Sequence, residues 1–138
     1  MKHLNDGACQ HCLEIINRFP NFDAELLTWF LMVQAAFPDF HIAEAGRGRQ
    51  LQDEDFAHGL SKASYGESAH NYNLAFDTFF LVDEKYSLDP KLYAALVPEI
   101  PDHIEWYGAQ GAVFYERPHF EKRNWKYLRA QGLLKLVE

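Results

Sequence analysis

The sequence contains no apolar run of the roughly 18 residues that a membrane-spanning helix needs. Its first seven residues lack the apolar stretch of a signal peptide, so we expect a chain made in the cytoplasm, without membrane insertion. No block of Lys and Arg stands out, and the formal net charge is −7. Because nucleic-acid-binding proteins normally carry a basic patch, this composition argues against nucleic acid as a partner.

What remains suits one small globular domain. The chain has 138 residues, of which 48% are hydrophobic and 15% aromatic. This length leaves little room for a second domain, and the aromatic residues supply the bulk of a core. We therefore expect a single, monomeric domain over residues 1–138, with a helical extension at 1–22, and we exclude disordered and low-complexity classes.

Only two cysteines occur, Cys9 and Cys12, with His11 between them. A finger-like zinc site needs a second pair of ligands downstream, and a thioredoxin-like pair needs a βαβ context; the sequence shows neither. The apolar residues that follow predict an amphipathic helix, so the plainer interpretation is two thiols on a first helix. A metal site that includes His3 or His11 is the alternative.

Hydrophobic periodicity and turn residues predict a mixture of helices and strands. Helices are expected at 8–19, 23–36, 51–58, 89–96 and 124–131, and strands at 40–43, 74–82, 104–106 and 119–121. Asp23 is expected to be the N-cap of the second helix. The polar segment 61–73 is predicted to be irregular, and 133–137 to be a short strand or an extension. Helices come first and strands follow without a βαβ rhythm, which indicates the α+β class.

Two segments carry the residues best suited to chemistry. Asp77 lies in the apolar run 74–82, where a carboxylate is costly to bury unless it is paired or bound to a cation, and His70 precedes it. Downstream, Glu116 and His119 flank a proline, which restricts the local backbone. Two histidines and an aspartate would make a three-ligand zinc site with an open position, where Glu116 would accept a proton from water. The alternative is ordinary loop histidines, with Asp77 capping a helix or pairing with an arginine.

The other histidines are less suited to binding. His3, His11, His41 and His58 stand alone at positions that we expect to be exposed or half-exposed. His103 is harder to dismiss, because a proline and an aspartate precede it directly. The residues alone therefore leave one leading candidate site.

The spacing of the candidate ligands resembles a known signature. Ser68-x-His70-x6-Asp77, followed by Glu116-x-x-His119, is similar to the pattern of the M15 family of zinc peptidases. That family includes D-Ala-D-Ala carboxypeptidases and dipeptidases, and L-alanyl-D-glutamate endopeptidases that act as phage endolysins. The resemblance implies an α+β fold of the hedgehog/DD-peptidase type, with a central antiparallel sheet flanked by helices.

Further motifs of the family occur in the same order. Residues 44–52 are similar to its arginine loop, with Arg47 at the arginine, and residues 58–63 match its Gly-x-Ser-Lys-Ala turn. Residues 104–106 resemble the strand that precedes the last ligand. The resemblance extends over roughly residues 24–125.

Three positions depart from the family pattern. Asn73 replaces a glycine, but asparagine is the next-best residue for a left-handed backbone, so the turn can survive. Residues 106–108 read Trp-Tyr-Gly where the family has Trp-Gly-Gly. Glu116 matches the carboxypeptidase and dipeptidase branches, whereas some L-alanyl-D-glutamate endolysins carry aspartate there.

The resemblance also implies roles for individual residues. His70, Asp77 and His119 would hold Zn²⁺, and Glu116 would be the general base. Arg47 would stabilise the developing oxyanion or hold the substrate carbonyl.

Four residues are predicted to bind or orient the substrate: Ser68, Asn71, Tyr72 and Trp106. Glu121 either supports a metal ligand or is a solvated strand residue.

The substrate class that the resemblance implies is the stem peptide of bacterial peptidoglycan, cut at the L-Ala–D-Glu bond or at a D,D bond. With no signal peptide expected, the chain fits a phage-type lysis enzyme that reaches the cell wall after holin-type release or from a virion. The alternatives are a cytoplasmic D-Ala-D-Ala dipeptidase and a non-catalytic wall-binding or virion module.

Overall fold

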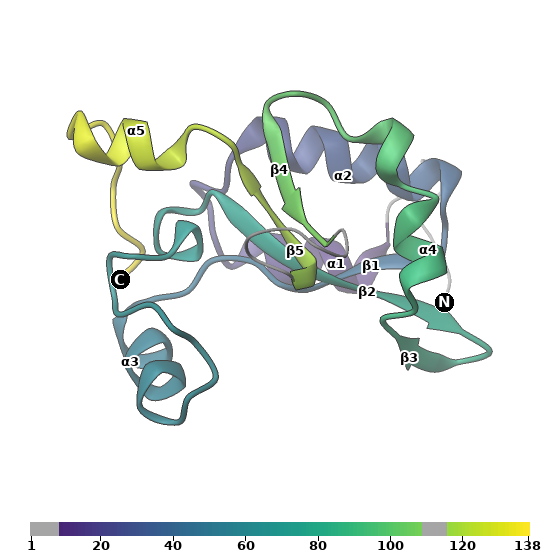
Figure 1. Ribbon diagram of the computed structural model, residues 1–138, viewed down its shortest axis with the longest axis horizontal. Helices are drawn as coiled ribbons and strands as arrows, with labels where there is room; N and C mark the ends of the chain where they lie inside the picture. The colour runs from purple at the N-terminus through teal and green to yellow at the C-terminus, as the bar shows by residue number, and fades with distance from the viewer. Residues whose placement is uncertain (1–8, 109–115) are drawn as a thin grey trace.

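A five-stranded antiparallel sheet runs through the chain, and helices pack around it (Figure 1). The computed structural model describes residues 9–108 and 116–138, with the backbone alone for residues 116 and 117. In chain order, the elements are α1 (Gln10–Asn17), α2 (Ala24–Ala36), β1 (Phe40–Glu44), α3 (Arg49–Ala57), η1 (Ala69–Tyr72), β2 (Ala75–Val82), β3 (Lys85–Ser87), α4 (Pro90–Ala94), η2 (Val97–Glu99), β4 (Ile104–Tyr107), β5 (Glu116–Lys122) and α5 (Trp125–Ala130). No helix within the described ranges combines the length and the apolar character that crossing a bilayer requires.

The strand order is β1-β2-β5-β4, and β3 pairs with the end of β2. Every pairing is antiparallel. The structure therefore confirms the expected α+β class and the central antiparallel sheet with flanking helices.

The two faces of the sheet differ sharply in chemistry because side chains alternate along a strand. In β2, Phe76, Thr78 and Phe80 are buried toward α2 and α4, whereas Asp77 points to the opposite face. Phe120 of β5 stacks on Phe76, with ring centroids 5.6 Å apart and planes 15° apart. One face thus carries the aromatic core, and the other is left for polar groups.

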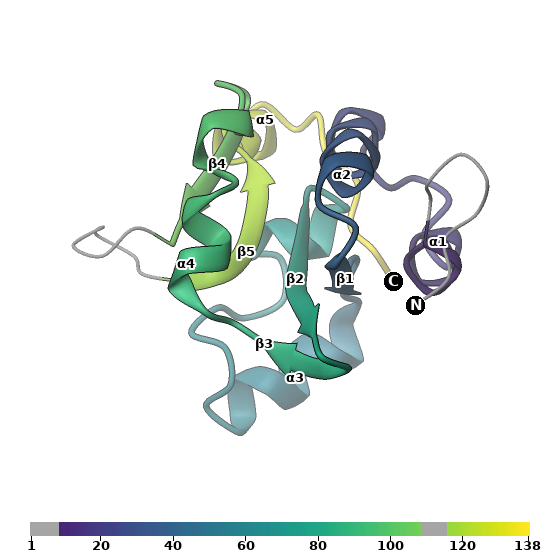
Figure 2. The same cartoon turned by 90° about the vertical axis from the view of Figure 1, so that its right-hand side faces the viewer.

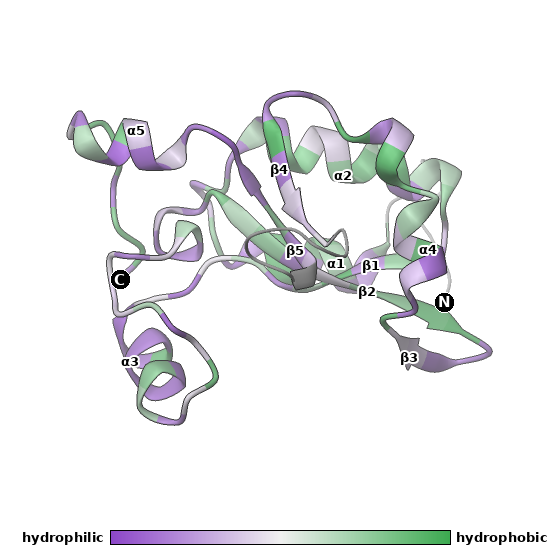
Figure 3. Ribbon diagram, in the orientation of Figure 1, coloured by the Kyte–Doolittle hydropathy of each residue, from purple (hydrophilic) through white to green (hydrophobic). Residues whose placement is uncertain are grey.

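Helix α2 supplies most of the cover for the aromatic face (Figures 1 and 2). It begins where Asp23 accepts a hydrogen bond from the backbone N–H of Leu26 at 3.0 Å, as the sequence predicts for an N-cap. Trp29 and Phe30 both contact Phe76. Figure 3 shows the resulting contrast between the hydrophobic α2 and the more hydrophilic α3.

Helix α1 lies beside the edge strand β1 (Figure 2). Cys9, Cys12, Ile15 and Ile16 are buried and belong to the same hydrophobic core as α2 and the sheet. The described part of the expected N-terminal extension is thus packed into the domain.

The turn after β2 escapes sequence prediction. Asp83 and Glu84 both have positive φ, 51° and 63°, and they reverse the chain into β3. Two-residue hairpin turns of this kind usually contain asparagine or glycine, so Asp-Glu gives no signal. Residues 133–138 form no strand, which leaves the extension as the correct alternative.

Candidate metal centre

On the polar face of the sheet, one residue from each of three neighbouring strands lies at the same level. Asp77 of β2 lies opposite His119 of β5 on one side and opposite Glu44 of β1 on the other. His70 comes from η1, the short 3-10 helix immediately before β2. Residues far apart in the sequence therefore meet through strand register.

Local hydrogen bonds fix the position of His70. The Ser68 hydroxyl accepts from the backbone N–H of His70 at 3.3 Å, and the Asn71 side chain accepts from the backbone N–H of Ser68 at 3.1 Å. Asn73 then ends η1 with φ 59° and ψ 31°. This left-handed conformation confirms the prediction for the position where the family pattern has glycine.

The three predicted ligands converge on one point. Oδ1 of Asp77 lies 3.2 Å from Nε2 of His70 and 3.0 Å from Nδ1 of His119. In a tetrahedral Zn²⁺ site with bonds of about 2.0–2.1 Å, neighbouring donor atoms are about 3.3 Å apart. Two imidazoles and a carboxylate at this spacing form a donor set that fits Zn²⁺.

In both imidazoles, the ring nitrogen that points away from Asp77 has a hydrogen-bond partner. Nδ1 of His70 lies 2.6 Å from the carbonyl oxygen of Ala45, and Nε2 of His119 lies 2.7 Å from Oε1 of Glu121. Each outer nitrogen therefore donates its proton away from the cluster, so that the inner nitrogen can face a metal. Glu121 in turn accepts from Nε1 of Trp125 at 2.7 Å.

Glu121 thus holds His119 in place and is not a solvated strand residue. Only 8% of it is exposed, and its two carboxylate oxygens have different partners. The sequence leaves both interpretations open for Glu121. It gives no indication of Trp125, and a backbone carbonyl such as that of Ala45 has no sequence signal at all.

The three side chains of the cluster interact strongly through their charges. Burial raises the pKa of Asp77, but the neighbouring charge of His70 and the hydrogen bonds from both histidines outweigh it and hold that pKa far below its usual range. Burial lowers the pKa of His119, whereas Asp77 and Glu121 together raise it to about 10. Without a metal, a proton on His119 therefore balances part of the negative charge.

Arg47 lies beside this cluster. Its Nη2 is 3.8 Å from Oδ2 of Asp77, while Nε donates to Glu44 at 2.6 Å and Nη1 donates to Gln52 at 3.1 Å. The guanidinium is buried and held on several sides. Its contact with a substrate stays a prediction, but the structure places Arg47 next to Asp77.

The predicted substrate residues differ in what surrounds them. Asn71 is fully buried; its Nδ2 donates to the Arg47 carbonyl at 2.9 Å and to Gln52 at 3.2 Å. Its Oδ1 accepts from the backbone N–H groups of Gly66 and Ser68. Asn71 therefore ties the loops together and has no exposed atom for a substrate, so the structure gives it a positioning role.

The two predicted aromatic residues are half-buried. Tyr72 packs on the ring of Trp125 and donates its hydroxyl to the carbonyl of Gly66 at 2.7 Å. Trp106 stacks on Phe120 at 6.2 Å and packs against the main core. Contact of either residue with a substrate stays a prediction, as does that of Ser68.

Glu116 is the first residue of β5, opposite Tyr107 of β4. Its side chain lies outside what the structure describes. The role of general base therefore remains a prediction from the sequence.

The remaining histidines follow the sequence prediction with one correction. His11, His58 and His103 are exposed, and His3 lies outside the described residues. His41, expected to be exposed or half-exposed, is only 1% exposed. The edge of a sheet normally faces solvent, but α1 packs against β1, and Sγ of Cys12 in α1 lies 3.7 Å from Nδ1 of His41.

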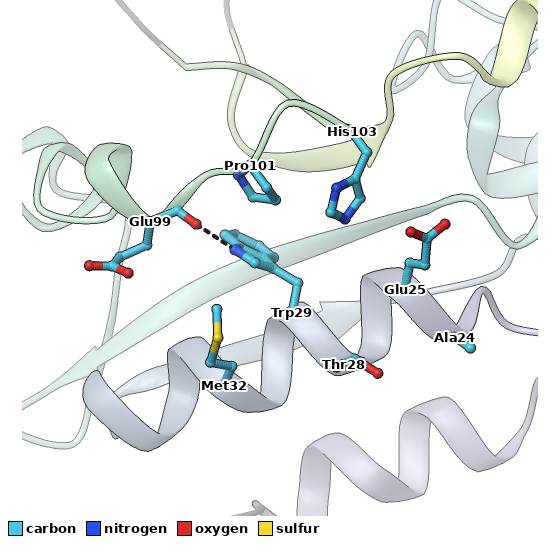
Figure 4. A pocket seen from close by; sticks show the side chains of 8 residues that line it. All are labelled: Ala24, Glu25, Thr28, Trp29, Met32, Glu99, Pro101 and His103. Carbon is cyan, nitrogen blue, oxygen red and sulfur yellow. Dashed lines mark hydrogen bonds between the residues drawn. The ribbon is translucent and has the colours of Figure 1, made fainter.

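His103 belongs to a separate pocket of about 400 Å³ (Figure 4). The pocket is lined by Ala24, Glu25, Thr28, Trp29, Met32, Glu99, Pro101 and His103. Nε1 of Trp29 donates to the Glu99 carbonyl at 2.7 Å, which closes one side. None of the predicted ligands lines this pocket, so it is distinct from the metal centre.

Comparisons with known proteins relate the chain to others through its fold. Neither protein-family models nor curated protein sequences give a match. Among solved structures, the chain is similar to the Serratia marcescens L-Ala D-Glu endopeptidase ChiX, with a TM-score of 0.64 and 18% sequence identity. The match covers 86% of this chain and 90% of that one. The two proteins therefore share a fold over almost their whole length.

Proposed function

We propose that this protein is a zinc-dependent peptidase that hydrolyses a bond in the stem peptides of bacterial peptidoglycan. The observation that carries the proposal is the convergence of His70, Asp77 and His119, with the outer nitrogen of each imidazole held by a hydrogen bond. Metal-ligating histidines almost always donate their other ring N–H to a carboxylate or a carbonyl in this way.

The fold supports the choice of substrate. The endopeptidase ChiX, to which the chain is similar, is named for the L-Ala–D-Glu bond. We therefore propose this bond as the first candidate, ahead of a D,D bond. The protein would meet its substrate in the cell wall, as a monomer, after holin-type release or from a virion.

The residues of the chain would divide the chemistry among them. Bound Zn²⁺ would supply Lewis acidity and lower the pKa of water at the open position. His70, Asp77 and His119 would hold the ion as three protein ligands, the number that catalytic zinc sites use. Glu116 would accept a proton at its carboxylate and return it to the departing amine. Arg47, fixed beside Asp77, would stabilise negative charge on the scissile carbonyl oxygen.

Digestion of purified sacculi tests this proposal directly. Protein loaded with Zn²⁺ is expected to release peptides with D-Glu at the new amino end, identified by mass spectrometry. The His119→Ala variant should release none, whereas His58→Ala, which changes an exposed histidine, should match the unmodified protein.

Other products would redirect the proposal. Release of D-Ala from sacculi would indicate cleavage of a D,D bond. Release of D-Ala from free D-Ala-D-Ala alone, with sacculi intact, would indicate a dipeptidase. No product from either substrate, with zinc bound, would refute the peptidase function and favour a non-catalytic wall-binding role.

A further inference from the structure

A second group of metal-binding side chains lies between α1 and β1. It consists of Cys9 and Cys12 at the start of α1 and His41 on β1, and all three are buried. Their donor atoms lie within 4.8 Å of one another. None of them belongs to the cluster of His70, Asp77 and His119, so this group requires its own explanation.

The distances suit coordination of one ion. Sγ of Cys12 lies 3.7 Å from Nδ1 of His41. With a Zn–S bond of about 2.3 Å, a Zn–N bond of about 2.1 Å and a tetrahedral angle, these two atoms would be about 3.6 Å apart. Cys12 and His41 would therefore need little rearrangement on metal binding, and Sγ of Cys9 lies within 4.8 Å of both donor atoms.

The surrounding hydrogen bonds prepare both donor atoms. Sγ of Cys12 accepts from the backbone N–H of Ile42 at 3.3 Å and from Nε2 of Gln34 at 3.7 Å. A thiol is a weak acceptor, so two N–H donors directed at one buried sulfur suit a thiolate better. The same contacts that orient Cys12 would stabilise its charge when a metal is bound.

Gln34 also determines which ring nitrogen of His41 is unprotonated. Its amide is oriented by two partners, because Nε2 donates to the Phe40 carbonyl at 2.8 Å and Oε1 accepts from the backbone N–H of Cys9 at 2.9 Å. The second N–H of Nε2 is therefore shared between Sγ of Cys12 and Nδ1 of His41, which lies 3.5 Å away. Nδ1 is then the acceptor, and an unprotonated nitrogen is what a metal ligand must provide.

Charge balance also suits a divalent ion at this buried position. Two thiolates and a neutral imidazole around Zn²⁺ have no net charge, which keeps the cost of burying the ion low. Binding would release two thiol protons to solvent.

We propose that Cys9, Cys12 and His41 form a second, structural Zn²⁺ site that fastens α1 to β1. The described residues supply three of the four donors that structural Zn²⁺ normally takes. The site is independent of the proposed peptidase function, because it shares no residue with the first centre and its ligands are buried.

Cobalt substitution tests the proposal on the unmodified chain. Protein produced in minimal medium with Co²⁺ as the added metal is expected to show the near-ultraviolet band of thiolate-to-cobalt charge transfer. The His119→Ala variant should keep this band, because the first centre contains no sulfur. Absence of the band, whether cobalt is missing or held by nitrogen and oxygen alone, would overturn the proposal.

Metal content gives a second readout. Purified without chelators, the unmodified protein should contain two equivalents of zinc, Cys12→Ser one, and the exposed neighbour control His11→Ala two. An unchanged zinc content in folded Cys12→Ser would overturn the site. A Cys9–Cys12 disulfide in freshly purified protein, seen as a mass lower by two hydrogens, would overturn it as well.

Discussion

Replacement of Glu121 by glutamine tests how the metal centre is held in place. The carboxylate of Glu121 accepts two hydrogen bonds, one from Nε2 of His119 and one from Nε1 of Trp125, each at 2.7 Å. Glutamine keeps the shape of the side chain but offers one acceptor oxygen and one donor amide. One of the two N–H groups must then face another N–H group.

The structure allows two separate magnitudes to be estimated. Loss of the carboxylate behind His119 should weaken zinc binding about 10- to 100-fold, which corresponds to about 1.4–2.7 kcal/mol. The buried donor left without a partner should lower the free energy of unfolding by about 1–3 kcal/mol. A residue that is merely solvated would change neither quantity.

A double-mutant cycle with Trp125→Phe separates the two effects. Phenylalanine removes the indole N–H, so the conflict with the glutamine amide disappears. The free energy of unfolding of Glu121→Gln/Trp125→Phe should therefore exceed the additive expectation by about 1 kcal/mol or more, while zinc affinity stays low. Denaturant unfolding of the metal-free variants measures the first quantity, and competition with a chelator measures the second.

Glu105 provides the matched control, because it lies opposite Glu121 on β4 and pairs with Arg123 at 2.9 Å. Glu105→Gln should leave zinc affinity unchanged. Equal affinities for Glu121→Gln and the unmodified protein, or strictly additive stabilities in the cycle, would refute the role assigned to Glu121.

Three further substitutions test the rest of the site. Glu116→Gln should lower kcat/KM on sacculi by about 100- to 10,000-fold at full zinc content, because only proton transfer is removed. Peptide release and metal analysis measure the two quantities, and full activity would exclude Glu116 as the base. Arg47→Lys should lower kcat/KM about 100-fold at unchanged zinc content, because lysine lacks the planar guanidinium group that contacts Glu44, Gln52 and Asp77 together. Equal kinetics of the variant and the unmodified protein would remove Arg47 from the mechanism. Asn73→Ala should lower the free energy of unfolding by about 1–2 kcal/mol in denaturant titrations, because φ of residue 73 is 59°. Asn73→Gly should lower it by almost nothing, and equal losses in the two variants would contradict the left-handed conformation.

Much of the fold follows from local sequence patterns. The N-cap at Asp23 and the apolar run that becomes β2 are visible in the sequence, and the structure confirms both. The hairpin at Asp83 and Glu84 is missed because these residues adopt positive φ without the usual glycine or asparagine. The sequence thus predicts elements well where the residue type itself determines the backbone.

The candidate site is predictable to the same extent. His70, Asp77 and His119 stand out because their spacing resembles a zinc peptidase signature, and the structure places them together. The carbonyl of Ala45 behind His70 is not predictable, since every residue has a carbonyl and only tertiary packing selects this one. Trp125 is missed for a similar reason, because an aromatic residue in a sequence indicates core before it indicates a hydrogen-bond donor.

His41 shows how packing can reverse an exposure expected from sequence. Its strand is at the sheet edge, where one side chain in two normally faces solvent. The helix that contains Cys9 and Cys12 covers that edge, and it converts an isolated histidine into part of a three-residue cluster. The sequence offers Cys9 and Cys12 a metal site only with His3 or His11, whereas the structure places His41 beside them.

The aromatic core and the metal centre depend on the same strand register. Phe76 lies opposite Phe120, and the next residue of β2, Asp77, lies opposite His119. A slip of one residue would exchange the faces, burying Asp77 under α2 and exposing a phenylalanine, so the stacked aromatic pair on the core face opposes any such slip. The pair therefore fixes the position of two proposed metal ligands that it does not touch. Substitutions at Phe76 or Phe120 should weaken zinc binding in proportion to how far they loosen this pairing, even though neither side chain reaches the ion.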